Sequence, residues 1–144
     1  MDRRFAFDTT WLVAASPEEV RDVLVDLEHY PAWWPEVRAV AKVGEDDAIV
    51  LCRSVLPYTL ELRLHAVSRE LPTLRVEVSG DLRGSVAWTL SDDGAGGTRI
   101  KASQEVALVP FPTVVVAAAR PVLVWNHHRM MRGCAAGLSA RLSG

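Results

Sequence analysis

His127 is the residue whose type and surroundings could do chemistry in this chain. Leu123 precedes it by four residues and Met131 follows it by four, so all three share one face of a helix. An imidazole on an apolar face can hydrogen-bond a ligand carbonyl or act as a general base. A core histidine that bonds a backbone carbonyl or a strand side chain explains the same pattern, and the sequence leaves both interpretations open.

Gln104 is a second polar residue among apolar neighbours. It alternates with Ala102 and Val106 in a stretch that has the period of a strand. A buried amide without partners costs about 1–3 kcal/mol. We therefore expect Gln104 to meet His127, water or a ligand, although the other strand register would turn it to solvent.

Arg53 and Tyr58 are further candidates in the middle of the chain. Arg53 lies between Leu51 and Val55. If it pointed inward, its guanidinium could hold a carboxylate or enolate oxygen in bidentate fashion, and otherwise it is a surface arginine. Tyr58 could place a phenol at a cavity mouth, or serve only in packing. With His127, these two are the candidates for proton transfer, and the sequence does not decide whether any of them is catalytic.

Large apolar side chains complete the set of expected ligand contacts. Trp34 and Trp88 could stack on a flat ligand, although core packing explains them equally well. Met130 and Met131 are soft and flexible, and their place beside His127 indicates an incompletely filled interior. The predicted ligand-binding residues are His127, Gln104, Trp88, Trp34, Leu123, Met130, Met131 and Arg53.

Metal and nucleophile patterns are missing from the sequence. His127 and His128 face about 100° apart on one helix, and no spacing of His, Cys and acidic residues resembles a zinc site. No glycine-rich phosphate loop follows a strand, and no Ser-His-Asp order stands on a suitable turn. We predict that the chain holds no metal.

A long C-terminal helix over residues 113–142 must position His127. Its apolar stripe consists of Val116, Ala119, Leu123, Met130, Met131, Cys134 and Leu138. Pro121 falls inside this helix and should kink or break it.

Strands and turns account for most of the chain before this helix. A strand is expected over residues 4–14, and a helix begins at the capping sequence Ser16-Pro17-Glu18-Glu19 and ends near residues 28–30. Six further strands are expected over 37–43, 49–56, 59–67, 74–79, 82–90 and 98–108. Strands on short connections pair antiparallel. The prediction is one α+β domain over residues 1–144: a curved antiparallel sheet of about seven strands wrapped on the long C-terminal helix, with two short helices after the first strand.

The composition of the chain indicates which kinds of binding partner to expect. The 144 residues are 49% hydrophobic and 24% charged, with a net charge of −2, which gives no electrostatic case for nucleic acid. The N-terminus lacks the apolar core of a signal peptide, and no apolar run reaches about 18 residues. We expect a cytoplasmic protein with no stable membrane anchoring, and the sequence leaves a homodimer open. Cys52 and Cys134 are expected as buried thiols, although a disulfide between them stays open.

The chain resembles the SRPBCC, or START-like, superfamily over essentially its whole length. The resemblance rests on residues 16–24, on residues 26–30 before Trp33-Trp34-Pro35, and on the strand entry Gly97-Thr98-Arg99-Ile100. Arg120-Pro121 through Asn126-His127, with Met130, Gly133 and Gly137-Leu138, is similar to the polyketide cyclase/dehydrase and lipid-transport branch. The resemblance implies a helix-grip fold, a hydrophobic ligand between sheet and helix, and no obligatory cofactor, whereas fold alone does not give function.

Three functions follow as hypotheses. The first is a binder of a hydrophobic small molecule of the polyketide, lipid or isoprenoid class. The alternative is a polyketide cyclase or aromatase that uses polar cavity residues to move protons. The third is a regulatory or pairing module whose pocket is filled, which predicts a solid core and an exposed apolar patch.

Overall fold

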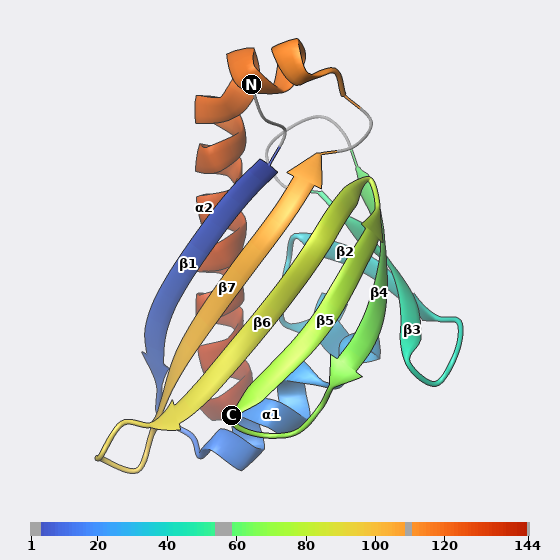
Figure 1. The fold of residues 1–144 in the computed structure, drawn as a ribbon. Coiled ribbons are helices and arrows are strands. Elements are labelled where there is room, and N and C mark those ends of the chain that lie inside the picture. The colour runs from blue at the N-terminus through green and yellow to red at the C-terminus, as the bar shows by residue number, and fades with distance from the viewer. Residues whose placement is uncertain (1–3, 54–58, 109–110, 144) are drawn as a thin grey trace.

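The computed structural model describes residues 4–53, 59–108 and 111–143 of the chain. It has seven strands and three helical segments (Figure 1). In chain order they are β1 (Arg4–Val13), α1 (Pro17–Leu24), the 3-10 helix η1 (Leu27–Ala32), β2 (Val37–Lys42), β3 (Asp47–Cys52), β4 (Leu60–Ser68), β5 (Thr73–Gly80), β6 (Leu82–Asp92), β7 (Thr98–Leu108) and α2 (Thr113–Ser143).

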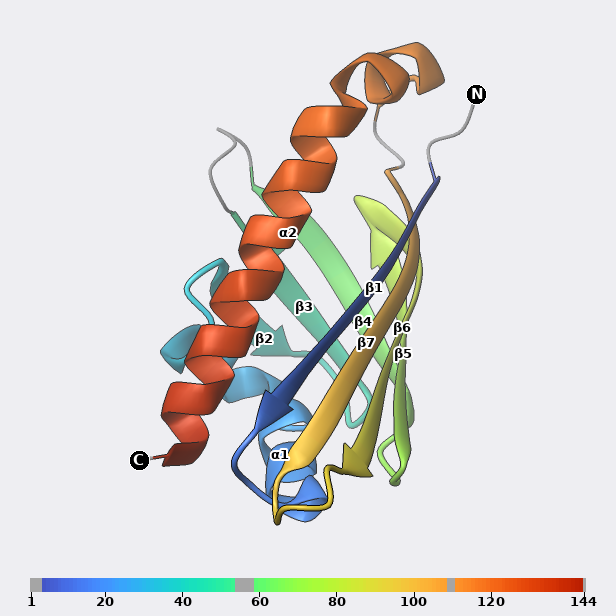
Figure 2. The same cartoon turned by 90° about the vertical axis from the view of Figure 1, so that its left-hand side faces the viewer.

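The strands form one antiparallel sheet in the order β1-β7-β6-β5-β4-β3-β2. Strands β2 to β7 pair with their neighbours in sequence, whereas β1 pairs with β7 at the far end of the chain. The sheet curves, and α2 runs along its concave side with α1 and η1 at one end (Figure 2). This is the predicted α+β helix-grip fold, with about seven strands and two short helical segments after the first strand.

The first helix begins as predicted and ends earlier. Ser16 and Glu19 form the reciprocal capping box that the sequence indicated. The helix stops at Leu24 instead of near residues 28–30, because Asp26 leaves the helical region at φ −91° and ψ 70°. Pro31 lies within the short 3-10 helix η1 that follows. This break lets Leu27 and Tyr30 turn toward the concave side of the sheet.

The last helix is continuous through Pro121. Its buried residues are Val116, Met131, Cys134 and Leu138, all members of the predicted stripe. Figure 2 shows its first turns at an angle to the rest, which fits the kink expected at a proline inside a helix. Cys52 and Cys134 are both buried free thiols, so the open question of a disulfide is answered against it.

Two glycines let the segment Trp33-Trp34-Pro35-Glu36, which we call the tryptophan corner, approach α2. A Cβ at Gly137 would overlap the carbonyl oxygen of Trp33, and one at Gly133 would overlap the carboxylate of Glu36. Trp34 is fixed in the same contact, because its indole Nε1 donates a 3.0 Å hydrogen bond to the carbonyl of Met130. The tryptophan corner therefore packs directly against the helix that carries His127.

Candidate ligand-binding cavity

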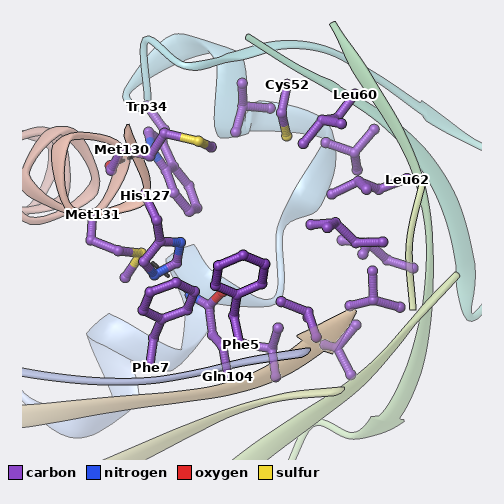
Figure 3. A pocket seen from close by; sticks show the side chains of 18 of the residues that line it. Phe5, Phe7, Trp34, Cys52, Leu60, Leu62, Gln104, His127, Met130 and Met131 are labelled. Atoms are coloured by element: carbon purple, nitrogen blue, oxygen red, sulfur yellow. Dashed lines mark hydrogen bonds between the residues drawn. The ribbon is translucent and has the colours of Figure 1, made fainter. Parts of the chain in front are cut away.

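A cavity of about 180 Å³ lies between the sheet and α2 (Figure 3). Its walls come from the first strand, η1, the strands β2 to β7 and the middle of α2. They consist mainly of aliphatic, aromatic and sulfur-containing side chains. The lining residues are Phe5, Phe7, Leu27, Tyr30, Trp34, Val37, Val50, Cys52, Leu60, Leu62, Leu64, Val76, Val78, Leu82, Val86, Trp88, Gln104, Val106, Leu108, Leu123, Asn126, His127, Met130 and Met131.

Strand alternation explains why these side chains meet. Successive side chains of a strand point to opposite faces, so every second residue reaches the concave side. On β4, for example, Leu60, Leu62 and Leu64 line the cavity, whereas Glu61 and Arg63 are exposed. The helix α2 covers this apolar face with the side that carries His127.

His127 lies on the cavity wall and is held by Phe7. The two rings stack with centroids 3.6 Å apart and planes inclined by 18°. The His127 Nε2 atom is buried and has no hydrogen-bond partner among the described residues. Burial, with a smaller contribution from the neighbouring His128, lowers the pKa of His127 to about 4. The ring is therefore neutral at pH 7, with one donor and one acceptor nitrogen.

Gln104 points inward, in the register that the sequence analysis expected. It pairs with Phe7 on β1 and with Val86 on β6, and its side chain lies beside His127 and Met131 (Figure 3). Its amide Nε2 donates to the Met131 Sδ atom at 3.4 Å. The partner inside the protein is thus a thioether and not His127. Since a thioether is a weak acceptor, the Gln104 amide keeps hydrogen-bonding capacity for another group.

The other predicted apolar contacts are also in the wall. Trp34, Trp88, Leu123, Met130 and Met131 all line the cavity. The Trp34 ring is oriented by the hydrogen bond of its Nε1 atom to the helix backbone. Seven of the eight residues predicted to contact a ligand therefore meet at one cavity, which makes it the candidate site.

Arg53 is the exception and requires a correction. On β3 the buried positions are Ala48, Val50 and Cys52, so the next residue lies on the opposite face. The strand also ends at Cys52, short of the expected residue 56, and Arg53 is exposed. The inward orientation of this arginine is wrong, and it is a surface residue. Tyr58, the other candidate from this stretch, lies outside the described residues.

Sequence reasoning missed several wall residues. Phe5 and Phe7 come from β1 and stack on each other with centroids 5.7 Å apart. Their alternation in the sequence was visible, but the pairing of β1 with β7, which puts them beside Gln104, was not. Asn126 is the polar residue that the sequence analysis did not single out, although it directly precedes His127.

The titratable groups of the wall are neutral at pH 7. Burial raises the pKa of the Cys52 thiol to about 12. Burial also raises the pKa of Tyr30, whose hydroxyl donates to the carbonyl of Leu24. With a neutral His127, no charged side chain is found among the lining residues that the structure describes. The cavity consequently favours an uncharged or weakly polar molecule.

The described residues offer no metal site and no membrane-spanning helix. No group of three or more His, Cys, Asp or Glu side chains is placed to hold a metal ion there. None of the helices in the described part is long and apolar enough to cross a membrane.

The architecture places the chain in the class of START-type helix-grip domains. It is similar to a START superfamily protein from Mycobacterium smegmatis, with 16% identity over 96% of this chain and 97% of the other and a TM-score of 0.77. The Zhui aromatase/cyclase from Streptomyces sp. R1128 has 13% identity over 97% and 94% and a TM-score of 0.82. Norcoclaurine synthase from Thalictrum flavum has 18% identity over 95% and 85% and a TM-score of 0.68.

The sequence itself gives the family. Residues 4–143 match the family described as polyketide cyclase / dehydrase and lipid transport, and the chain belongs to that family. No curated protein matches the chain. At these identities the solved structures support the fold, and the activity has to be argued from the cavity.

Proposed function

We propose that this chain binds a hydrophobic small molecule of the polyketide, lipid or isoprenoid class in the cavity between the sheet and α2. The observation that carries the proposal is the buried Nε2 atom of His127, which has no partner among the described residues and lies in a largely apolar cavity. A buried polar atom without a partner costs about 1–3 kcal/mol. A ligand that bonds this atom removes the cost, and its apolar body replaces the empty space.

The polar groups define the chemistry of the ligand. A neutral His127 and the amide of Gln104 can each donate or accept a hydrogen bond, so they suit a carbonyl or hydroxyl group. Binding pockets for drug-sized ligands have about 300–1,000 Å³, more than this cavity offers. A larger ligand therefore needs side chains to move, and the flexible Met130 and Met131 can do so at low cost.

The polyketide cyclase or aromatase function is the second candidate, favoured by the family description and by the similarity to the Zhui aromatase/cyclase. Such an enzyme needs at least two titratable groups that act on one bound molecule. Among the described lining residues whose pKa is shifted, none has a pKa near neutrality, since that of His127 is lowered to about 4 and those of Tyr30 and Cys52 are raised far above 7. A protein that only binds its ligand needs no second proton-transfer group, so binding without a reaction explains these lining residues more simply.

The decisive experiment is native mass spectrometry of the purified protein, followed by extraction and identification of retained small molecules. Leu62→Trp, which points into the cavity, should abolish retention by filling the space. Arg63→Trp is the matched control, because this exposed neighbour on β4 points away from the cavity. Two results would contradict the proposal. One is a wild-type protein that retains no small molecule after expression in cells that make lipids and polyketides. The other is a Leu62→Trp variant that retains as much as the Arg63→Trp control.

A further inference from the structure

The face of α2 that points away from the cavity carries exposed apolar side chains. Val122 and Trp125 retain 48% and 46% of their accessible surface, and Val114 and Val115 in the first turns retain 68% and 47%. Exposed residues of this size normally occur singly on the surface of a protein. Here they follow one helix that forms the outer layer of the molecule (Figure 2).

Basic side chains continue the same face. Val122, Trp125, Arg129 and Arg132 are separated by three or four residues, so they form one row along the helix, which we call the outward face of α2. The Arg129 guanidinium lies 6.0 Å from the centroid of the Trp125 ring. Both arginines are exposed, and no ion pair with a described carboxylate holds either of them.

The charge of α2 differs from that of the rest of the chain. Its 31 residues include four arginines and neither Asp nor Glu, although the whole chain has a net charge of −2. Random distribution of the 18 acidic residues would place several of them on a helix of this length. The outward face of α2 therefore combines apolar and aromatic side chains with arginines, and the helix has no acidic residue of its own to neutralise them.

We propose that the outward face of α2 docks reversibly on an anionic lipid surface. Val122 and Trp125 would enter the boundary between head groups and acyl chains, where indole rings are favoured. Arg129 and Arg132 would lie at the level of the lipid phosphates. The contact is peripheral, because the helix remains part of the domain and its opposite face lines the cavity.

A second copy of the chain fits this face less well. Two outward faces packed together would bring arginines near arginines with no carboxylate from either helix to pair with them. An anionic lipid surface supplies negatively charged head groups for the arginines and an apolar acyl-chain region for Val122 and Trp125. Charge complementarity therefore favours the lipid surface over self-association.

The test uses co-sedimentation of the full chain with vesicles of phosphatidylcholine, with and without phosphatidylglycerol, at low and high salt. We expect binding to the anionic vesicles at low salt and its loss at high salt. Arg129→Ser should weaken the partition coefficient about fivefold, and the double variant with Arg132→Ser about 25-fold. Val122→Asp should weaken it more than tenfold, since it places a charge in the apolar part of the contact.

The matched control is Val67→Asp, which charges an exposed valine of similar accessibility on β4 and should bind vesicles like the wild type. Circular dichroism verifies that all variants are folded. Wild-type protein that stays in solution with anionic vesicles, or equal binding by the Val122→Asp and Val67→Asp variants, overturns the proposal. A dimer in analytical ultracentrifugation that Val122→Asp dissociates, without vesicle binding, overturns it in favour of self-association.

This inference stands apart from the proposed cavity ligand. The substituted residues point away from the cavity, so the retained small molecule measured by native mass spectrometry should be the same in these variants. Loss of vesicle binding with unchanged retention tests the surface alone. An empty cavity with intact vesicle binding contradicts the proposed function and leaves the docking surface in place.

Discussion

Replacing His127 with phenylalanine should weaken ligand binding without weakening the fold. Phenylalanine keeps a flat aromatic ring at this position and can keep the stack on Phe7, which holds the histidine ring at a centroid distance of 3.6 Å. The substitution removes both ring nitrogens, including the buried Nε2 atom that has no partner among the described residues. It therefore isolates the hydrogen-bonding capacity of His127 from its packing.

The expected magnitudes follow from burial. Without Nε2, a bound carbonyl or hydroxyl group loses its partner inside an apolar cavity, which costs about 1–3 kcal/mol, or about a 5- to 150-fold loss of affinity. In the protein without ligand, the substitution removes a buried nitrogen that has no hydrogen-bond partner among the described residues. Its free energy of unfolding should therefore stay the same or rise by about 1 kcal/mol.

Two measurements check this prediction side by side. Urea denaturation gives the free energy of unfolding, and native mass spectrometry gives the occupancy of the ligand that the wild type retains. His128→Phe is the control, because His128 adjoins His127 in the sequence and is exposed. It should change neither quantity by a comparable amount.

The result that would refute the reasoning is the reverse pattern. If His127→Phe lowered the free energy of unfolding by more than about 1 kcal/mol while occupancy stayed at the wild-type level, Nε2 would have a structural partner. His127 would then be a core histidine, which is the interpretation that the sequence also allowed.

Three other predictions concern stability. The pKa of His127 is lowered to about 4 from an ordinary value of 6.5, so His127 takes up its proton in the unfolded chain before it does so in the folded one as the pH falls. This residue should therefore lower the free energy of unfolding by about 3 kcal/mol between pH 6.5 and pH 4. His127→Phe should remove this pH dependence in urea denaturation. Gly137→Ala should cost about 3 kcal/mol in thermal denaturation, since its Cβ meets the fixed backbone carbonyl of Trp33, whereas Gly133→Ala should cost less because it meets a movable side-chain carboxylate. Ser16→Ala should cost about 1 kcal/mol by removing the capping box of α1.

Each of these has a contradicting outcome. An unchanged pH slope in His127→Phe would assign the acid sensitivity to other groups. Equal melting temperatures for the two glycine variants would show that the backbone at the tryptophan corner yields as easily as a side chain. A Ser16→Ala variant as stable as the wild type would mean that the capping box is replaced by water at no cost.

The fold was predictable where local patterns decide it. The alternation in residues 98–108 put Gln104 on the same face as Val106 and left open which face is buried, and both residues line the cavity. The spacing around His127 gave the inner side of α2 for the same kind of reason, since one row of a long helix packs on the sheet.

Other features depend on contacts that no local pattern contains. The inward side of residues 49–56 was ambiguous, because apolar residues stand at both odd and even positions, and Arg53 was therefore a candidate. In the structure β3 ends at Cys52, and Arg53 follows it as an exposed residue. The early end of α1 depends on the turn at Asp26 that brings Tyr30 under the tryptophan corner. Phe7 joined the site only through pairing with a strand more than ninety residues later in the chain.

That late pairing of β1 has a consequence for biosynthesis. While the polypeptide is being translated, β2 to β6 can form hairpins with neighbours that are already outside the ribosome, but β1 has no partner until residue 108 has emerged. Until then, Phe5 and Phe7 stay exposed on a nascent segment with an unpaired edge. Closing so large a loop is slow compared with forming hairpins. The first strand of the sheet in chain order is thus among the last to be incorporated into it.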